Sequence, residues 1–397
     1  MVIATIHASD STNTLVSLDN NHDARSKLIS SSSDSNSGTC CRRTSSDWQK
    51  TALLLPADEL DLDYSSNDYD CHCACEEDEQ ALFLPSASSD VVDCLKQIPA
   101  IQETREELVA FEPRVFTEAS TERILYVHQG EVAHAVASQE CDVIMSDRAT
   151  TCHILALHST ASSGATSEPM SSLTHIDGDH YEACVQDLVD AHKRHHGKNV
   201  FELQIHVVGG FADDEGQSSK ISNWLVRVLA RIADASSNMT MRLQTCVVSS
   251  MNDNGFQCPM GRGLAMELKT GRVFLAKATH AVMGPHMALR MARLWSAGTT
   301  KEHKLHVIHT ATSDDMVIQP FAFAALPGMD KLMALPDQVL LEYTSTSPAV
   351  EEDDFCYSIR TTICFLQKVS CTKVFGRHCD RTLRFGRRSN TNDWKLM

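Results

Sequence analysis

Hydrophobic and polar residues change their spacing several times along the chain of 397 residues, and each change predicts a structural element. Residues 202–208 alternate apolar and polar positions, which is the period of a strand with one buried face. The Gly209-Gly210 pair that follows predicts a turn. Further strand-like segments are residues 123–128, 131–137, 152–158, 241–248, 263–268 and 272–276.

Three longer segments have apolar residues three and four positions apart, which predicts helices. They are residues 181–195, 216–232 and 353–368. Between two predicted strands, Gln129-Gly130 indicates a hairpin that joins 123–128 to 131–137. Strands and helices interleave without a regular strand–helix–strand period or an internal repeat. This order favours an α/β (α+β) sandwich, with mixed sheets and flanking helices, over a doubly wound sheet.

Composition divides the chain into three parts. Residues 1–80 are rich in Ser, Asn, Asp and Thr and lack a sustained hydrophobic period, so we expect a largely disordered acidic extension. Residues 81–368 contain the predicted strands and helices and form the expected folded domain. Residues 369–397 are basic, and we expect a flexible C-terminal tail.

Overall composition excludes several classes of protein. Hydrophobic residues make up 42% of the chain, which excludes complete disorder. The formal net charge of −17 repels phosphate backbones, so nucleic acid is not an expected partner. No apolar run reaches the roughly 18 residues of a membrane helix, and the first residues resemble neither a secretory signal nor an Arg-rich transit peptide. We therefore expect an intracellular protein without a membrane partner, whose 15 cysteines are reduced thiols.

The most informative chemistry lies in residues 146–157. A loop of small and polar residues ends at Cys152, which opens an apolar strand and would lie beside free backbone N–H groups able to hold an oxyanion. His175 follows 23 residues later and can return on a neighbouring strand, where it would supply the base that a thiol needs. The alternative is a core thiol, because free cysteine is among the most buried residue types. His153 would point to the opposite face of the strand and is interpreted as structural.

Several uncommon blocks occur together in an order found in one known family. They are Ile124-Leu125-Tyr126-Val127, Ser146-Asp147, Ala149-Thr150-Thr151-Cys152-His153-Ile154, Leu173-Thr174-His175 with Asp177-Gly178, His206-Val207-Val208-Gly209-Gly210-Phe211 and Ser345-Thr346-Ser347-Pro348. Over roughly residues 82–367 the sequence resembles the eukaryotic protein N-terminal asparagine amidohydrolases. Its hydroxyl residue, Cys and following His also resemble those of the bacterial chemotaxis-receptor deamidases and the deamidating cytotoxic toxins, which implies their sandwich fold.

The resemblance implies a cysteine-dependent amidohydrolase that needs no cofactor. It would convert the N-terminal Asn of a protein or peptide to Asp and release ammonia, with Cys152 as nucleophile, His175 as general base and acid, and Ser146 orienting the imidazole. The family further implies that the new terminus is a degradation signal, read by an arginyltransferase and by ubiquitin ligases. A cytoplasmic location, with the nucleus as a second one, follows from the same resemblance.

Selectivity for a chain terminus requires a group that recognises the free α-ammonium. A carboxylate suits this role, because its charge-assisted hydrogen bond is lost when the nitrogen is in a peptide bond. The candidates are Asp177, Asp213 and Asp214, each with turn formation or helix capping as the alternative.

Two other functions remain open: deamidation of internal Gln or Asn in a partner protein, and a non-catalytic adaptor with a buried Cys152. We expect no metal, since the run Cys71-His72-Cys73-Ala74-Cys75 is too tightly spaced for a four-ligand zinc site.

Overall fold

Long strands that are buried on both faces over most of their length build the central sheet of the protein. The structure is a computed structural model, and it describes residues 48–56, 81–85, 90–162, 167–295, 304–388 and 391–397. Eight strands form this sheet in the order β13-β5-β8-β7-β9-β10-β1-β2. Their bounds are β1 Trp48–Leu54, β2 Ala81–Pro85, β5 Glu131–Val136, β7 His153–Ala161, β8 Met170–Ile176, β9 Phe201–Gly209, β10 Met239–Val248 and β13 His306–His309. The sheet is mixed, because β7 runs antiparallel to both β8 and β9 while β9 and β10 are parallel.

A second sheet of five short strands has the order β3-β12-β11-β6-β4. Its strands are β3 Arg114–Phe116, β4 Ile124–Tyr126, β6 Val143–Ser146, β11 Leu264–Glu267 and β12 Val273–Ala278. Strands β11 and β12 form an antiparallel pair, and β6 pairs antiparallel with β11 and parallel with β4.

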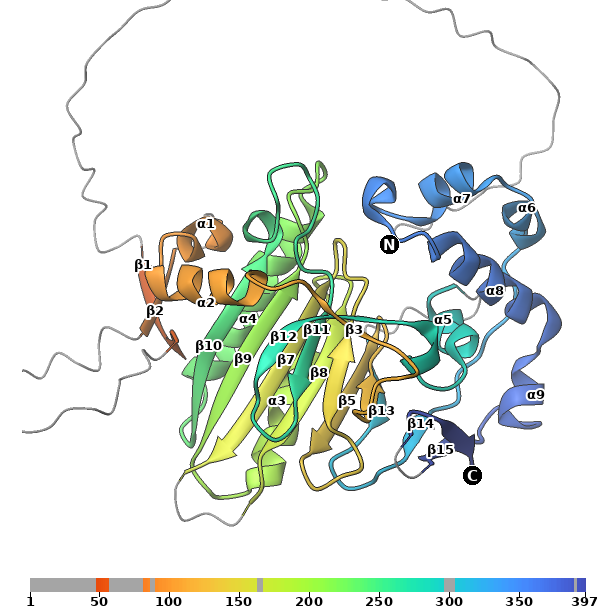
Figure 1. The fold of residues 1–397 in the computed structure, drawn as a ribbon. Coiled ribbons are helices and arrows are strands. Elements are labelled where there is room, and N and C mark those ends of the chain that lie inside the picture. The colour runs from red at the N-terminus through yellow and green to blue at the C-terminus, as the bar shows by residue number, and fades with distance from the viewer. Residues whose placement is uncertain (1–47, 57–80, 86–89, 163–166, 296–303, 389–390) are drawn as a thin grey trace, which may run out of the picture. The chain divides into compact units, whose positions relative to one another are not determined.

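The alternation of side chains along β7 determines what covers each face of the large sheet. Leu155 and Leu157 are fully buried and belong to the hydrophobic core formed with α3 (Glu182–His196) and α4 (Gln217–Asp234). Ile154 points to the opposite face, and His175 lies directly across from it on β8. On that face His175 contacts Ser146 of β6, so the five-stranded sheet covers it. Figure 1 shows the resulting layers of helices, large sheet and small sheet.

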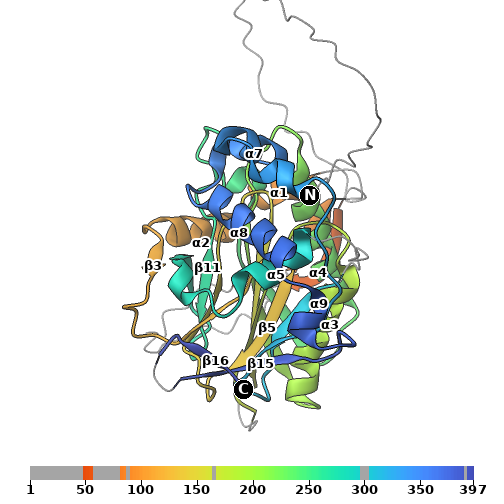
Figure 2. The same ribbon diagram turned by 90° about the vertical axis from the view of Figure 1, so that its right-hand side faces the viewer.

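Shorter elements complete the fold, and the C-terminal ones lie together in Figure 2. They are α1 Val91–Leu95, α2 Pro99–Val109, α5 Met287–Trp295, α6 Met329–Met333, α7 Asp337–Thr344, α8 Phe355–Lys368, α9 Cys371–Phe375, and the single-turn helices η2 Ser249–Met251, η3 His280–Val282 and η4 Pro348–Val350. A three-stranded sheet has the order β14-β15-β16, with β14 Met316–Ile318, β15 Leu383–Arg387 and β16 Trp394–Leu396. The mixed α/β architecture and the three predicted helices, now α3, α4 and α8, are confirmed. Among the described residues, no helix has the length and apolar character needed to cross a membrane.

A buried ion cluster fixes β5 against α5. Arg290 and Arg293 both contact the carboxylate of Glu131, and the three side chains are almost fully buried. Burial raises the pKa of Glu131, but the two arginines outweigh this effect and lower it to about 2. Glu131 is therefore ionised, which is the state that a buried carboxylate keeps only beside cations.

Three predictions about chain organisation are wrong in the described residues. The first is the disordered extension over 1–80, because residues 48–54 form β1, which pairs with β10 and β2 and buries Leu53 completely. The second is the flexible tail over 369–397, because it contains α9, β15 and β16 and buries Phe375 and Phe385. Both segments are short and apolar only at a few positions, so their order depends on partners that are distant in sequence.

The third wrong prediction is the hairpin at Gln129-Gly130. Strand β4 belongs to the five-stranded sheet, whereas β5 pairs with β8 and β13 in the eight-stranded sheet. The turn connects two sheets instead of two neighbouring strands, which the local sequence does not reveal. The expectation that every thiol is reduced also differs from the structure, in which Cys371 and Cys379 form a disulfide.

Candidate active site

Cys152 lies at the junction between a loop and the first residue of β7. The loop starts at Ser146, the last residue of β6, and its backbone is fixed at Ala149, whose N–H donates to the carbonyl oxygen of Arg262 at 2.8 Å. At the other end, the N–H of Gly210 donates to the carbonyl oxygen of Cys152 at 2.9 Å. A Cβ atom on Gly209 would lie 2.3 Å from that oxygen, so the approach of β9 to Cys152 requires glycine.

Asp147 anchors the beginning of the same loop. Its buried carboxylate accepts hydrogen bonds from the Tyr126 hydroxyl at 2.6 Å and from the Ala278 N–H at 2.7 Å. The next residue, Arg148, has φ of +61°, and its guanidinium binds Asp354 at 2.8 Å. These contacts attach the loop to β4, to the end of β12 and to the segment before α8.

His175 and Ser146 form the hydrogen bond that joins the two sheets at the site. Ser146 Oγ lies 2.9 Å from His175 Nδ1, and both residues are buried. Nε2 of His175 has no hydrogen-bond partner among the described residues. Burial lowers the pKa of His175 to about 4, although the charge of Asp177 acts in the opposite direction. The imidazole is therefore neutral at physiological pH, with one nitrogen available to a neighbour.

Sheet register places Cys152 on the same face as His175. Ile154 lies opposite His175, and Cys152, two positions earlier on the strand, points to the same side. Extension of the register by one pair brings Cys152 opposite Asp177, with His175 as its diagonal neighbour at the usual cross-strand spacing of about 7–8 Å. Burial raises the pKa of the half-buried Cys152 thiol well above its ordinary value, and the charge of Asp177 raises it further. The resting thiol is protonated, so its reaction needs a base.

Asp177 is held in place by two side chains. Its carboxylate accepts hydrogen bonds from the Tyr181 hydroxyl at 2.7 Å and from Gln129 Nε2 at 2.8 Å. The sheet register and the effect of its charge on the pKa of Cys152 place this predicted substrate-binding acid near the thiol.

Asp213 and Asp214 have other partners. Asp213 accepts from the N–H groups of Gln217 and Ser218 and so caps α4, while Asp214 contacts the side chain of Gln257. Within the described part of the chain, neither residue contacts Cys152, His175 or Ser146. Their geometry corresponds to the capping and turn alternatives.

Sequence reasoning missed a wall of the site that comes from residues 345–351. Thr346 Oγ1 lies 3.0 Å from Thr151 Oγ1, immediately before Cys152. Glu351 accepts a hydrogen bond from Ser345 Oγ, and its charge contributes to the raised pKa of Cys152. Burial in turn raises the pKa of Glu351 itself. The Ser345-Thr346-Ser347-Pro348 block was the available signal, but nothing in the sequence indicated that it folds back onto the thiol.

His153 has the structural role predicted for it. Its Nε2 lies 2.7 Å from the Ser222 hydroxyl of α4, on the helical side of the sheet. Among the residues that the structure describes, no group of three His, Cys, Asp or Glu side chains could hold a metal ion. The run of cysteines and histidine at 71–75 lies outside the described residues.

A thiol and a neutral imidazole on one face of the large sheet, with the Ser146 hydroxyl on the imidazole, define a candidate hydrolase site. Comparison with known proteins identifies the family, because residues 114–396 match the family model of protein N-terminal asparagine amidohydrolase. The chain belongs to this family.

Individual relatives carry the same name. The human protein N-terminal asparagine amidohydrolase is 32% identical over 250 residues, which cover 62% of this chain and 75% of the human protein. The pig protein is also 32% identical, over 252 residues and the same shares of the two chains. The Arabidopsis thaliana protein is 24% identical over 356 residues, which cover 80% of this chain and 96% of the plant protein.

Proposed function

We propose that this protein hydrolyses the side-chain carboxamide of an N-terminal Asn to give N-terminal Asp and ammonia. The observation that carries the proposal is the Ser146–His175 hydrogen bond, which leaves Nε2 of a neutral imidazole unpartnered on the face of the sheet that bears Cys152. The names of the relatives support the substrate, since each is a protein N-terminal asparagine amidohydrolase. From the sequence resemblance we infer the sandwich fold of the chemotaxis-receptor and toxin deamidases.

The first chemical step is acylation of Cys152. His175 Nε2 takes the thiol proton while sulfur bonds to the carboxamide carbon, and backbone N–H groups of the preceding loop hold the oxyanion. The C–N bond then breaks, and the imidazolium gives its proton to the departing nitrogen, which leaves as ammonia. A thioester between Cys152 and the Asn-derived acyl group remains.

The second step is hydrolysis of the thioester. His175 takes a proton from water, the oxygen attacks the thioester carbon, and the thiolate leaves and is reprotonated by the same imidazole. Throughout, Ser146 accepts a hydrogen bond from Nδ1–H and keeps the tautomer in which Nε2 is the base.

Two acids are suited to bind the α-ammonium of the substrate. Asp177 and Glu351 both act electrostatically on Cys152, so both lie within range of a substrate whose carboxamide reaches the thiol. We assign substrate recognition to this pair, with Asp177 positioned by Tyr181 and Gln129. The capping contacts of Asp213 and Asp214 make these two residues weaker candidates.

The product has consequences for other proteins. An N-terminal Asp exposes a new carboxylate next to the α-ammonium, and we infer from the family that an arginyltransferase and ubiquitin ligases act after this reaction. The same inference places the protein in the cytoplasm and the nucleus.

The test compares three peptides of one sequence: one with free N-terminal Asn, one acetylated at that Asn, and one with an internal Asn. Ammonia release and a mass gain of about one dalton are expected for the free terminus alone, and Cys152→Ala should abolish both. Equal rates on the free and acetylated peptides would identify an internal deamidase instead. Absence of ammonia from every peptide, in a folded protein, would favour the adaptor.

A further inference from the structure

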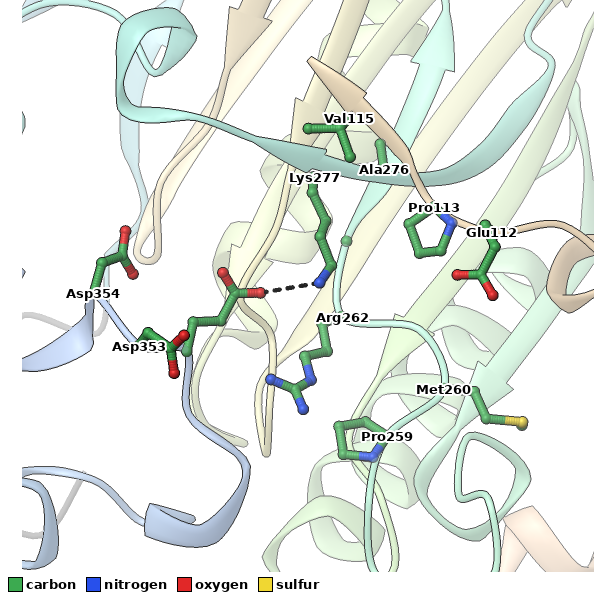
Figure 3. A pocket seen from close by; sticks show the side chains of 12 residues that line it. Glu112, Pro113, Val115, Pro259, Met260, Arg262, Ala276, Lys277, Asp353 and Asp354 are labelled. Carbon is green, nitrogen blue, oxygen red and sulfur yellow. Dashed lines mark ion pairs between the residues drawn. The ribbon is translucent and has the colours of Figure 1, made fainter. Parts of the chain in front are cut away.

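A cavity of about 640 Å³ lies outside the Cys152 site and has no role in the mechanism above. Four segments line it: residues 112–115 at the start of β3, the loop 259–263, the residues 276 and 277 of β12, and residues 352–354 before α8. Figure 3 shows the acids of the last segment on one side of the cavity and Glu112 on the other side, with Arg262 and Lys277 between them.

Two of these walls belong to segments that also border the candidate active site. Glu352 in the cavity follows Glu351, whose charge acts on Cys152. Arg262 accepts the backbone hydrogen bond from Ala149 in the loop before Cys152, and its charge also acts on Glu351. A peptide whose first residue occupies the Cys152 site can therefore continue into the cavity with its following residues.

The charges in the cavity leave a negative surplus. Lys277 is paired with Glu352 at 3.5 Å, and Asp354 is paired with Arg148 at 2.8 Å. Arg262 has no ion pair with a described residue, although its charge acts on Glu351. The lining thus holds four acids, Glu112, Glu352, Asp353 and Asp354, against the two cations Arg262 and Lys277. The carboxylates of Glu112 and Asp353 have neither an ion pair nor a side-chain hydrogen bond with any described residue, and both residues are exposed, so they are accessible to a ligand in the cavity.

The remaining walls are apolar. Between the charged groups, the cavity presents the side chains of Pro113, Val115, Pro259, Met260 and Ala276. An apolar wall that ends in free carboxylates is complementary to a long methylene chain with a cationic head, which is the chemistry of Lys and Arg. A short acidic side chain would meet the two free carboxylates and be repelled.

We propose that the cavity binds a Lys or Arg side chain of the substrate, located after the N-terminal Asn. This inference rests on the proposed function, because it needs the Asn-initiated chain to extend from Cys152. The cavity contributes to substrate binding and leaves the chemical steps at Cys152 unchanged. The expected preference is modest, on the order of two- to fivefold in kcat/KM at low salt, as for ion pairs with partial solvent exposure.

The experiment uses Asn-initiated peptides of otherwise uncharged sequence that carry one test residue, moved from position two to position five. Lys is compared with norleucine, which keeps the methylene chain and lacks the charge, and with Glu. At one position kcat/KM should fall in the order Lys, norleucine, Glu, through KM with kcat constant, and the difference should shrink at high salt. A constant KM at every position, or a preference for Glu, overturns the proposal.

Variants locate the effect. In the double variant Glu112→Gln, Asp353→Asn the advantage of Lys over norleucine should disappear while the norleucine peptide keeps its rate. The matched control is Asp187→Asn, an exposed acid on α3 at the opposite side of the large sheet, and it should keep the advantage. An advantage that persists in the double variant excludes these carboxylates as its source.

A binding measurement separates failure of this inference from failure of the proposed function. Fluorescently labelled Lys and norleucine peptides are titrated into the Cys152→Ala protein, and anisotropy gives the two dissociation constants. If no Asn peptide is hydrolysed by the unmodified protein but Lys still binds more tightly, the function is wrong and the cavity assignment stands. Equal dissociation constants contradict the cavity assignment whatever the activity.

Discussion

Ser146 and His175 come from different sheets, and their side chains meet at a distance of 2.9 Å. This contact predicts that Ser146→Ala slows turnover without removing the nucleophile. Loss of the hydroxyl leaves Nδ1–H buried without an acceptor, at a cost of about 1–3 kcal/mol, and releases the tautomer that keeps Nε2 basic. We expect kcat to fall on the order of tenfold or more, while Ser146→Thr, which keeps a hydroxyl, should retain more activity. Ammonia release at saturating substrate measures the effect, and an unchanged kcat would contradict the positioning role.

Glu351→Gln tests the assignment of substrate recognition. We expect kcat/KM on free N-terminal Asn to fall by about tenfold, since a charge-assisted hydrogen bond to the α-ammonium is lost. The negative charge of Glu351 raises the pKa of Cys152, so its removal should make alkylation by neutral iodoacetamide somewhat faster. Unfolding would also slow turnover and expose the thiol, so an unchanged melting temperature of the variant is needed to show that the two effects come from a binding role.

A matched control for this experiment is Glu342→Gln, an exposed acid on α7. It should change neither rate. If Glu351→Gln leaves kcat/KM unchanged, Asp177 alone is left as the acid for the α-ammonium.

Leu53→Ala tests whether residues 48–54 belong to the folded domain. Leu53 is fully buried in the core beneath α4, so its truncation should cost about 2–5 kcal/mol of unfolding free energy. Ala52 points to the exposed face of the same strand, and Ala52→Ser should have little effect. Urea denaturation of both variants provides the measurement. A midpoint for Leu53→Ala equal to that of the unchanged protein would return these residues to an unstructured extension.

Stability should decrease between pH 6.5 and pH 4. Burial lowers the pKa of His206 and His153 to about 3 and that of His175 to about 4, below the ordinary value near 6.5. The unfolded chain therefore binds more protons than the folded chain in this range, and the stability present above pH 6.5 is lost as the pH falls. Carboxylates with lowered pKa, such as Glu131, act only at more acidic pH.

Thermal melts from pH 8 to pH 5 measure this dependence. His206→Gln should flatten the decrease, whereas substitution of the exposed His378 by Gln should not. A melting temperature that is constant from pH 7 to pH 5 would contradict neutral burial of these histidines.

The sequence predicts the long elements because their periodicity and their environment agree. The apolar alternation of Leu203, Ile205 and Val207 and the helical stripe that includes Leu225 both face one hydrophobic core in the structure. Cys152 could be proposed as a candidate residue for a related reason, since a polar loop that ends at an apolar strand is a local pattern. His175 could be proposed from its position 23 residues later, but its placement on the same face as Cys152 depends on the pairing between β7 and β8.

Local sequence is less informative where the outcome depends on partners that are distant in the chain. Gln129-Gly130 has the composition of a hairpin turn, but β4 and β5 find their neighbours in different sheets. Asp213 follows a glycine turn close to the site, yet the N–H groups of α4 take both of its carboxylate oxygens. Glu351 comes near Cys152 because residues 345–351 fold over the loop before Cys152, where Thr346 contacts Thr151. No local sequence pattern encodes this folding back.

Because β7 and β8 are antiparallel, the number of residues between the proposed nucleophile Cys152 and the proposed base His175 does not determine how the two side chains lie in space. Cys152 precedes β7 and His175 lies near the end of β8, so the segment that links the two strands leaves from the opposite end of the sheet. Residues can be added to or removed from the connection between β7 and β8 without moving the thiol relative to the imidazole. Relatives can therefore differ in the number of residues between these two positions and still share one active-site geometry, which a search by fixed spacing would overlook.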